Sequence, residues 1–97
     1  MKKFIVEREV PGAGAMTADE LRGVACTSNA ALREMNAPYH WVQTFVTDNK
    51  MYCVHIAPDE ETVREHGRRG GFPVDRIEEV CAVIDPTTER VPQPVAA

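Results

Sequence analysis

A hairpin in the middle of the chain restricts the possible folds more than any other segment. Residues 39–47 and 50–57 both have the composition of strands, and only Asp48-Asn49 separates them. Asp and Asn tolerate the positive φ angles of a two-residue turn better than most residues, so the segment predicts a β-hairpin. A hairpin with helix signals on both sides leaves few arrangements besides a mixed α+β fold.

The first helix is predicted between an early strand and this hairpin. Residues 3–9 alternate β-branched and aromatic residues with charged ones, which indicates a strand. Thr17 and Glu20 have the spacing of a capping box, in which each side chain binds a free amide at a helix start. Apolar residues then recur with a 3.6-residue period for about five turns, until Asn36 and Pro38.

A second helix and a last strand are predicted after the hairpin. Proline and acidic residues suit a helix start, and Pro58 is followed by three acids. This helix should run to about Arg69 and end at Gly70-Gly71. Residues 79–85 are predicted as the fourth strand, and Val80, Ala82 and Ile84 should share one face.

The predicted order is therefore β-α-β-β-α-β. Together with right-handed crossovers, this order predicts a ferredoxin-like α+β sandwich with both helices on one face of an antiparallel sheet. A chain of 97 residues has room for one domain, which we place at residues 1–88, with an extended tail at 89–97. The opposite sheet face must be solvated or covered by something else.

Charge and composition exclude several classes of protein. The net charge of −4 argues against a nucleic-acid binder, and the cluster of Arg64, Arg68 and Arg69 among acids is typical of a solvated helix face. No apolar run is long enough for a membrane span and no signal-peptide core follows Met1, so we expect a cytoplasmic protein. The three cysteines are far apart, and Cys26 and Cys81 are expected to be reduced core residues.

The hairpin register predicts which side chains share a face. A two-residue turn pairs Thr44 with Cys53, Val42 with His55 and His40 with Ala57. We expect the bulkier set to lie under the helices: Trp41, Phe45, Tyr52, Val54 and Ile56. The other set should lie on the open face: His40, Val42, Thr44, Val46, Met51, Cys53 and His55.

His40, Cys53 and His55 would then be close enough to share one ion. Imidazole and thiolate suit nickel, copper and zinc, which makes these residues candidate metal ligands. His66 is a further candidate beside Glu61 and Glu65, and it could equally donate a hydrogen bond at the core edge. A strand histidine is more often a hydrogen-bonded polar group than a ligand, so both interpretations stand. No usable catalytic motif is found.

Seven short motifs also support a family resemblance, which extends from about Phe4 to Thr88. They are His40-Trp41-Val42, Thr47-Asp48, Tyr52-Cys53-Val54, Ala57-Pro58-Asp59, Arg64-Glu65-His66, Gly70-Gly71-Phe72-Pro73 and Ile84-Asp85-Pro86. The chain resembles the small actinobacterial nickel-binding, nickel-responsive proteins, a family otherwise described as a domain of unknown function. The resemblance implies a ferredoxin-like fold, a homodimer, bound Ni2+ and a role in sequestration or detoxification.

Three functions follow as hypotheses. The first is a homodimeric protein that binds and buffers Ni2+ without catalytic turnover. The second is a small-molecule isomerase or cyclase with a pocket between two sheets of a dimeric α+β barrel, where His40 or His55 would act as a general base. The third is an interaction domain whose open sheet face only dimerises.

Overall fold

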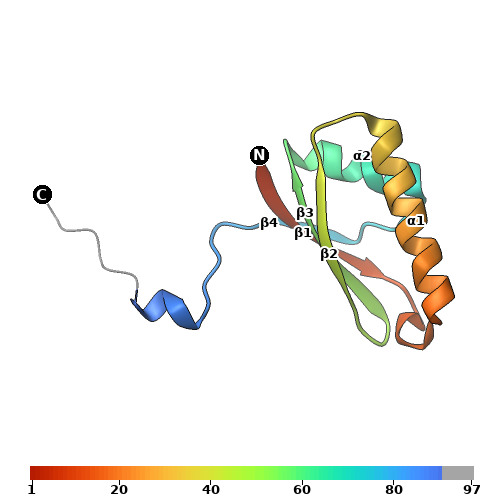
Figure 1. Ribbon diagram of the computed structural model, residues 1–97, viewed down its shortest axis with the longest axis horizontal. Coiled ribbons are helices and arrows are strands. Elements are labelled where there is room, and N and C mark those ends of the chain that lie inside the picture. The colour runs from red at the N-terminus through yellow and green to blue at the C-terminus, as the bar shows by residue number, and fades with distance from the viewer. Residues whose placement is uncertain (91–97) are drawn as a thin grey trace, which may run out of the picture.

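Four antiparallel strands form one sheet, and both helices lie on one of its faces (Figure 1). The computed structural model describes residues 1–90. The order of strands across the sheet is β2-β3-β1-β4, so the predicted ferredoxin-like α+β fold is confirmed. The elements are β1 (Lys2–Glu9), α1 (Ala18–Met35), β2 (His40–Val46), β3 (Lys50–Ala57), α2 (Glu60–Gly70) and β4 (Arg76–Glu79), with short 3-10 helices at Ala13–Ala15 and Pro86–Arg90.

The predicted helix signals are confirmed at both helices. Thr17 caps α1, and Thr17 and Glu20 exchange the two hydrogen bonds of a capping box. Asn36 ends α1 in the left-handed conformation. Helix α2 begins after Asp59, whose carboxylate accepts a hydrogen bond from the Thr62 amide, and it ends at Gly71 with φ of 70°. Neither α1 nor any other helix of residues 1–90 is long and apolar enough to cross a membrane.

The core lies between the sheet and the helices. Phe4 and Val6 from β1 pack with Val63 from α2, and all three are almost fully buried. Cys53 and Ala57 from β3 complete this cluster. The buried residues of β1 alternate with Lys3, Ile5 and Glu7, which are more exposed. This alternation defines the dry face of the sheet, which is the face buried under the helices.

The Asp48-Asn49 hairpin is confirmed, but its register changes after four residue pairs. Thr44 lies opposite Cys53 as predicted. A β-bulge between Trp41 and Gln43 then places Trp41 opposite His55 and His40 opposite Ile56. A bulge inserts one extra residue in one strand, so every pairing beyond it shifts by one. The predicted pairs of Val42 with His55 and of His40 with Ala57 are therefore wrong.

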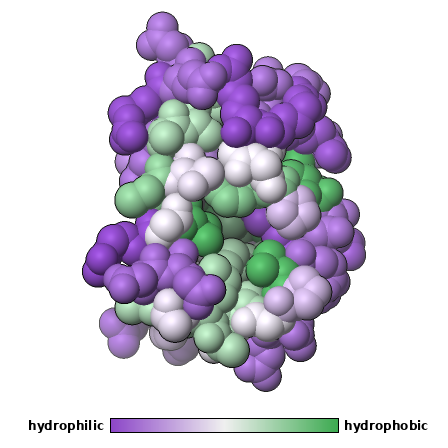
Figure 2. Space-filling view, turned by 90° about the vertical axis from the view of Figure 1, so that its right-hand side faces the viewer, coloured by the Kyte–Doolittle hydropathy of each residue, from purple (hydrophilic) through white to green (hydrophobic). Residues whose placement is uncertain are grey.

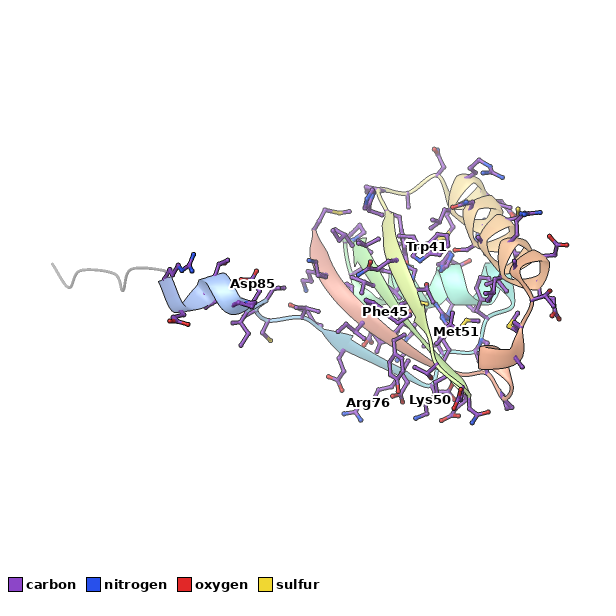
Figure 3. The ribbon with its side chains drawn as sticks, turned by 60° about the horizontal axis from the view of Figure 1, so that its bottom comes forward. Trp41, Phe45, Lys50, Met51, Arg76 and Asp85 are labelled. Carbon is purple, nitrogen blue, oxygen red and sulfur yellow. The ribbon has the colours of Figure 1, made fainter. Side chains whose placement is uncertain are left out.

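The assignment of the hairpin faces is wrong for most residues. Met51, Cys53 and His55 are buried under the helices, because they pair with Arg8, Val6 and Phe4 on the dry face of β1. Trp41 lies under the helices as predicted, because the bulge brings it to the side of His55. The residues that lie on the open face instead are Phe45, Tyr52, Val54 and Ile56. Figure 3 shows Trp41 and Met51 on the side of α1 and Phe45 on the other side of β2.

The fourth strand and two cysteines also differ from prediction. Strand β4 is Arg76–Glu79, which pairs with β1, and Ile77 from it packs against the core. Residues 81–85 form no strand and are exposed, and the chain leads away from the sheet there (Figure 1). Five consecutive apolar residues at 80–84 resembled a strand. The pairing of β4 with β1 nevertheless ends at Glu79 and Phe4, after which the Val80 amide donates one hydrogen bond to the Lys3 carbonyl. Cys26 and Cys81 are exposed free thiols and not core residues. The predicted tail begins at residue 89, and its residues 91–97 lie outside the described part.

Candidate functional site

A cavity of about 270 Å³ lies between the sheet and α1. Figure 2, seen from the side on which α1 lies in Figure 1, shows a hollow bordered by hydrophobic side chains. Leu21, Val24 and Ala25 from α1 form one wall of the cavity. Strands β2 and β3 contribute the opposite wall, which includes Trp41 and Met51. This volume is near the lower end of the range for small-molecule sites.

Polar groups enter this largely apolar cavity from four elements. Alternation along β3 directs His55 toward the helices, and β1 contributes Arg8 from its dry face. His66 comes from the buried side of α2, and Ser28 from the buried side of α1. His66 Nε2 and Ser28 Oγ are 3.1 Å apart and share a hydrogen bond. The predicted hydrogen bond of His66 at the core edge is confirmed.

Three aromatic rings form a triangle beside the cavity. The ring centroids of His55 and His66 are 5.3 Å apart, and the Tyr39 ring lies 5.2 Å from His55 and 5.4 Å from His66. Both ring nitrogens of His55, Nδ1 of His66 and the Tyr39 hydroxyl are buried without a hydrogen-bond partner among residues 1–90. Leaving such groups unpaired costs free energy, so the two histidines, which also line the cavity, are candidate contacts for a ligand.

Both imidazoles are neutral at pH 7. Burial, with smaller contributions from the neighbouring His66 and Arg8, lowers the pKa of His55 to about 3. Burial and the charge of Arg8 also lower the pKa of His66, against a smaller opposite effect of Ser28. Burial raises the pKa of Tyr39, so its hydroxyl keeps its proton. Neutral imidazole is the form that binds metal ions.

Among the buried residues of the described range 1–90, Arg8 is the one with a permanently charged side chain. Its Nη1 donates to the Pro73 carbonyl at 2.7 Å, and its Nε donates to Cys53 Sγ at 3.4 Å. The guanidinium also lies 5.5 Å from the centroid of the Phe72 ring, a cation–π distance. A short chain of hydrogen bonds approaches the same sulfur from β2, since Trp41 donates to Thr44 and Thr44 donates to Cys53.

The structure brings together three of the four predicted metal ligands. Cys53, His55 and His66 all line the cavity. His40 does not, because it pairs with Ile56 and is exposed on the opposite sheet face. The prediction that His40 and His55 share a site is therefore wrong, because the bulge places their side chains on opposite faces of the sheet.

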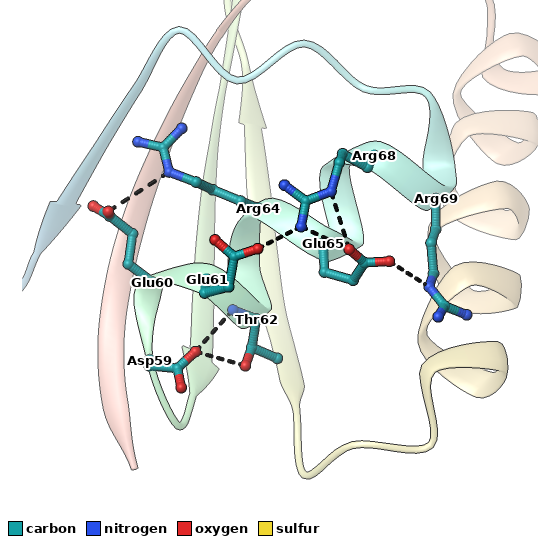
Figure 4. A network of polar contacts seen from close by, with 8 residues as sticks. All are labelled: Asp59, Glu60, Glu61, Thr62, Arg64, Glu65, Arg68 and Arg69. Atoms are coloured by element: carbon teal, nitrogen blue, oxygen red, sulfur yellow. Dashed lines mark hydrogen bonds and ion pairs between the residues drawn. The ribbon is translucent and has the colours of Figure 1, made fainter.

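The predicted surface site of His66 with acidic neighbours is also wrong. His66 is only 1% exposed and faces the cavity, while Glu61 and Glu65 pair with Arg68 on the outer side of α2 (Figure 4). Hydrogen bonds from Arg69 and Arg68 lower the pKa of Glu65. The prediction that these arginines belong to a solvated helix face is confirmed.

Sequence reasoning missed the roles of Arg8 and Tyr39. Arg8 has the same parity as Phe4 and Val6 along β1, and this parity was a usable signal that it points into the core. Tyr39 comes just before β2 and belongs to no regular element, so its position carried no comparable signal.

A metal ion would find two suitable donors in the cavity. Two imidazoles that bind one ion at ~2.1 Å have ring centroids roughly 4.5–5.5 Å apart, and the rings of His55 and His66 fall in this range. Residues 1–90 contain no group of three or more histidine, cysteine, aspartate or glutamate side chains that could hold a metal. The distance between the two rings therefore allows at most two protein ligands to one ion, the other positions being filled by water or a small molecule.

Comparisons with known proteins give a family and a solved structure that this chain resembles. The model of the family described as "Nickel responsive protein SCO4226-like" matches residues 4–80. The solved structure described as the crystal structure of SCO4226 from Streptomyces coelicolor A3(2) superposes with a TM-score of 0.71 at 24% identity. The match covers 84% of this chain and 99% of that one, and at this identity it shows the shared fold. No curated protein matches the chain.

Proposed function

We propose, because the chain belongs to the SCO4226-like family of nickel-responsive proteins, that it binds Ni2+ through His55 and His66. One observation carries the proposal: two neutral imidazoles lie side by side in a cavity, and three of their four nitrogens have no hydrogen-bond partner among residues 1–90. Imidazole is a good ligand for nickel, and an ion at these nitrogens would satisfy groups that are otherwise buried at a cost.

We restrict the proposed ligands to the two histidines. Cys53 lines the same cavity, but its sulfur already accepts hydrogen bonds from Arg8 and Thr44. His40 is left out because it lies on the other sheet face. A site with two neutral ligands beside the Arg8 cation favours moderate affinity and ready release, which suits a buffer that sequesters nickel more than a structural site.

The proposed function also includes a homodimer that pairs through the open sheet face. Phe45 and Ile5 on this face are 54% and 41% exposed, and half-buried Tyr52, Val54 and Ile56 lie beside them. An exposed apolar patch on a sheet is a common protein contact. The alternative of an isomerase or cyclase has no comparable support, and the cavity described above lies between the sheet and α1 of one chain.

Nickel titration of the metal-free protein tests the proposed ligands. Isothermal titration of wild-type protein is expected to give a dissociation constant below ~100 µM for Ni2+, and His55→Leu should weaken binding by at least tenfold. His40→Leu is the matched control, since it removes an imidazole from the opposite face, and it should leave the isotherm unchanged. The proposal would be contradicted if wild-type protein did not bind Ni2+, or if His40→Leu lost nickel binding while His55→Leu kept it.

A further inference from the structure

Arg8 is a buried cation without an anionic partner. Arg8 is 3% exposed, and its side chain lies on the dry face of β1. None of the ion pairs formed within residues 1–90 includes Arg8. Removing a charge from water costs several kcal/mol unless an opposite charge and hydrogen bonds compensate for it. The position therefore calls for an anion that the described residues do not supply.

The contacts of Arg8 within the protein leave part of its binding capacity unused. A guanidinium has five N–H donors in a planar fork, and here Nε and Nη1 each donate one hydrogen bond. The acceptors are the Pro73 carbonyl and the Cys53 sulfur, and the Phe72 ring adds a cation–π contact. These contacts orient the group, but they include no carboxylate. A planar fork with free donors is suited to bidentate binding of a carboxylate.

The cavity beside Arg8 has the size and walls for the rest of such a ligand. Its volume of about 270 Å³ equals that of roughly nine water molecules at ~30 Å³ each, which is enough for a ligand the size of a single ring with a carboxylate. Leu21, Val24 and Met51 line it with aliphatic and thioether groups, and Trp41 adds an aromatic one. These walls favour an apolar body, while the only charge that lines the cavity within residues 1–90 is the guanidinium.

We propose that this cavity binds a small organic acid, whose carboxylate pairs with Arg8 and whose apolar body fills the space between the sheet and α1. The inference goes beyond nickel binding and stands on Arg8 and the cavity alone. The acid also supplies the negative charge that a nickel ion at His55 and His66 would require beside a guanidinium. Occupancy of the cavity by the acid should therefore tighten nickel binding, and the reverse holds by linkage.

Titration with benzoate in the presence of EDTA tests the proposal without any metal. Benzoate has nine non-hydrogen atoms, and Trp41, the single tryptophan, reports on the cavity by its fluorescence, with calorimetry as a second readout. Benzoate is expected to bind with a dissociation constant of ~1 mM or below. Benzamide, which lacks the charge, and acetate, which lacks the body, should each bind at least tenfold more weakly. Equal binding of benzoate and benzamide, or no binding of benzoate, overturns the proposal.

Two variants test the charge of Arg8 and the space in the cavity separately. Arg8→Met should weaken benzoate at least tenfold, with Arg64→Met on the outer side of α2 as the matched control. Ala25→Leu narrows the cavity and leaves Arg8 in place, so it should also weaken the fluorescence response to benzoate, and it decides the matter if Arg8→Met does not fold. Unchanged benzoate binding in Ala25→Leu overturns the proposal. Benzoate binding in EDTA by a protein that fails to bind nickel would retain this inference and remove the proposed function.

Discussion

Replacement of His55 by leucine should make the metal-free protein more stable. His55 is 1% exposed, and neither ring nitrogen has a hydrogen-bond partner among residues 1–90. An unpaired buried polar group costs about 1–3 kcal/mol, and leucine has a similar volume without polar atoms. We expect the free energy of unfolding at pH 7.5 to rise by about 1–2 kcal/mol, which corresponds to ~4–8 °C in Tm for each kcal/mol in a domain of this size.

The same substitution should remove the part of the acid sensitivity of the fold that His55 causes. In the folded protein the pKa of His55 is about 3, against an ordinary value of 6.5. Below pH 6.5 the unfolded chain therefore binds a proton that the folded chain does not, and stability falls as the pH drops toward 3. Between pH 7.5 and pH 5 this linkage costs about 2 kcal/mol, so the variant should exceed wild type by about 3–4 kcal/mol at pH 5.

Urea denaturation at pH 7.5 and pH 5.0 in EDTA measures both effects. Circular dichroism follows unfolding at a fixed protein concentration, and linear extrapolation gives the free energies. His40→Leu changes an exposed histidine, and its free energy of unfolding should stay within about 0.5 kcal/mol of wild type at both pH values. A destabilised His55→Leu variant, or a difference from wild type that does not depend on pH, would refute the reasoning about this buried imidazole.

Three other outcomes are expected. Phe45→Asp places a charge in the apolar patch of the open sheet face and should shift the protein from dimer to monomer, as sedimentation equilibrium measures; a variant that stays dimeric would exclude this face. Ni2+ at a hundredfold excess over its dissociation constant should raise the unfolding free energy of wild type by about 2.7 kcal/mol and leave His55→Leu nearly unchanged in thermal denaturation; an equal gain in both proteins would exclude His55 as a ligand. Gly67→Ala brings a methyl group to 2.8 Å from Val74 Cγ2 and should cost about 1–3 kcal/mol in urea denaturation, whereas Gly23→Ala, which meets no atom within 4 Å, should cost nothing; equal stability of the two variants would contradict the close packing at Gly67.

Local signals in the sequence were sufficient for most of the fold. The capping box at Thr17, the Asp48-Asn49 turn and the glycines after Arg69 each depend on a few neighbouring residues, and each is found where it was predicted. The order of elements then determined the topology. The last strand was misplaced because its limits depend on a distant partner, β1, which pairs with it only from Phe4 to Glu7.

The candidate site could be predicted only in part, because it depends on the register of the sheet. The size of the hairpin side chains was the wrong criterion for deciding which hairpin face is buried. That face is determined by its pairing with Phe4 and Val6 on the neighbouring strand β1. The bulge at Val42 has no clear sequence signal, and it moves His40 away from His55. The pairing of His55 with His66 joins a strand to a helix, and no spacing within the sequence indicates such a contact.

Anomalous diffraction from crystals grown with nickel, recorded on both sides of the nickel absorption edge, tests the central proposal most directly. We expect one anomalous peak per chain inside the cavity, within coordination distance of a ring nitrogen of His55 and of His66 Nδ1. A peak that lies instead at His40 or elsewhere on the outer surface, with the cavity free of nickel, would contradict it.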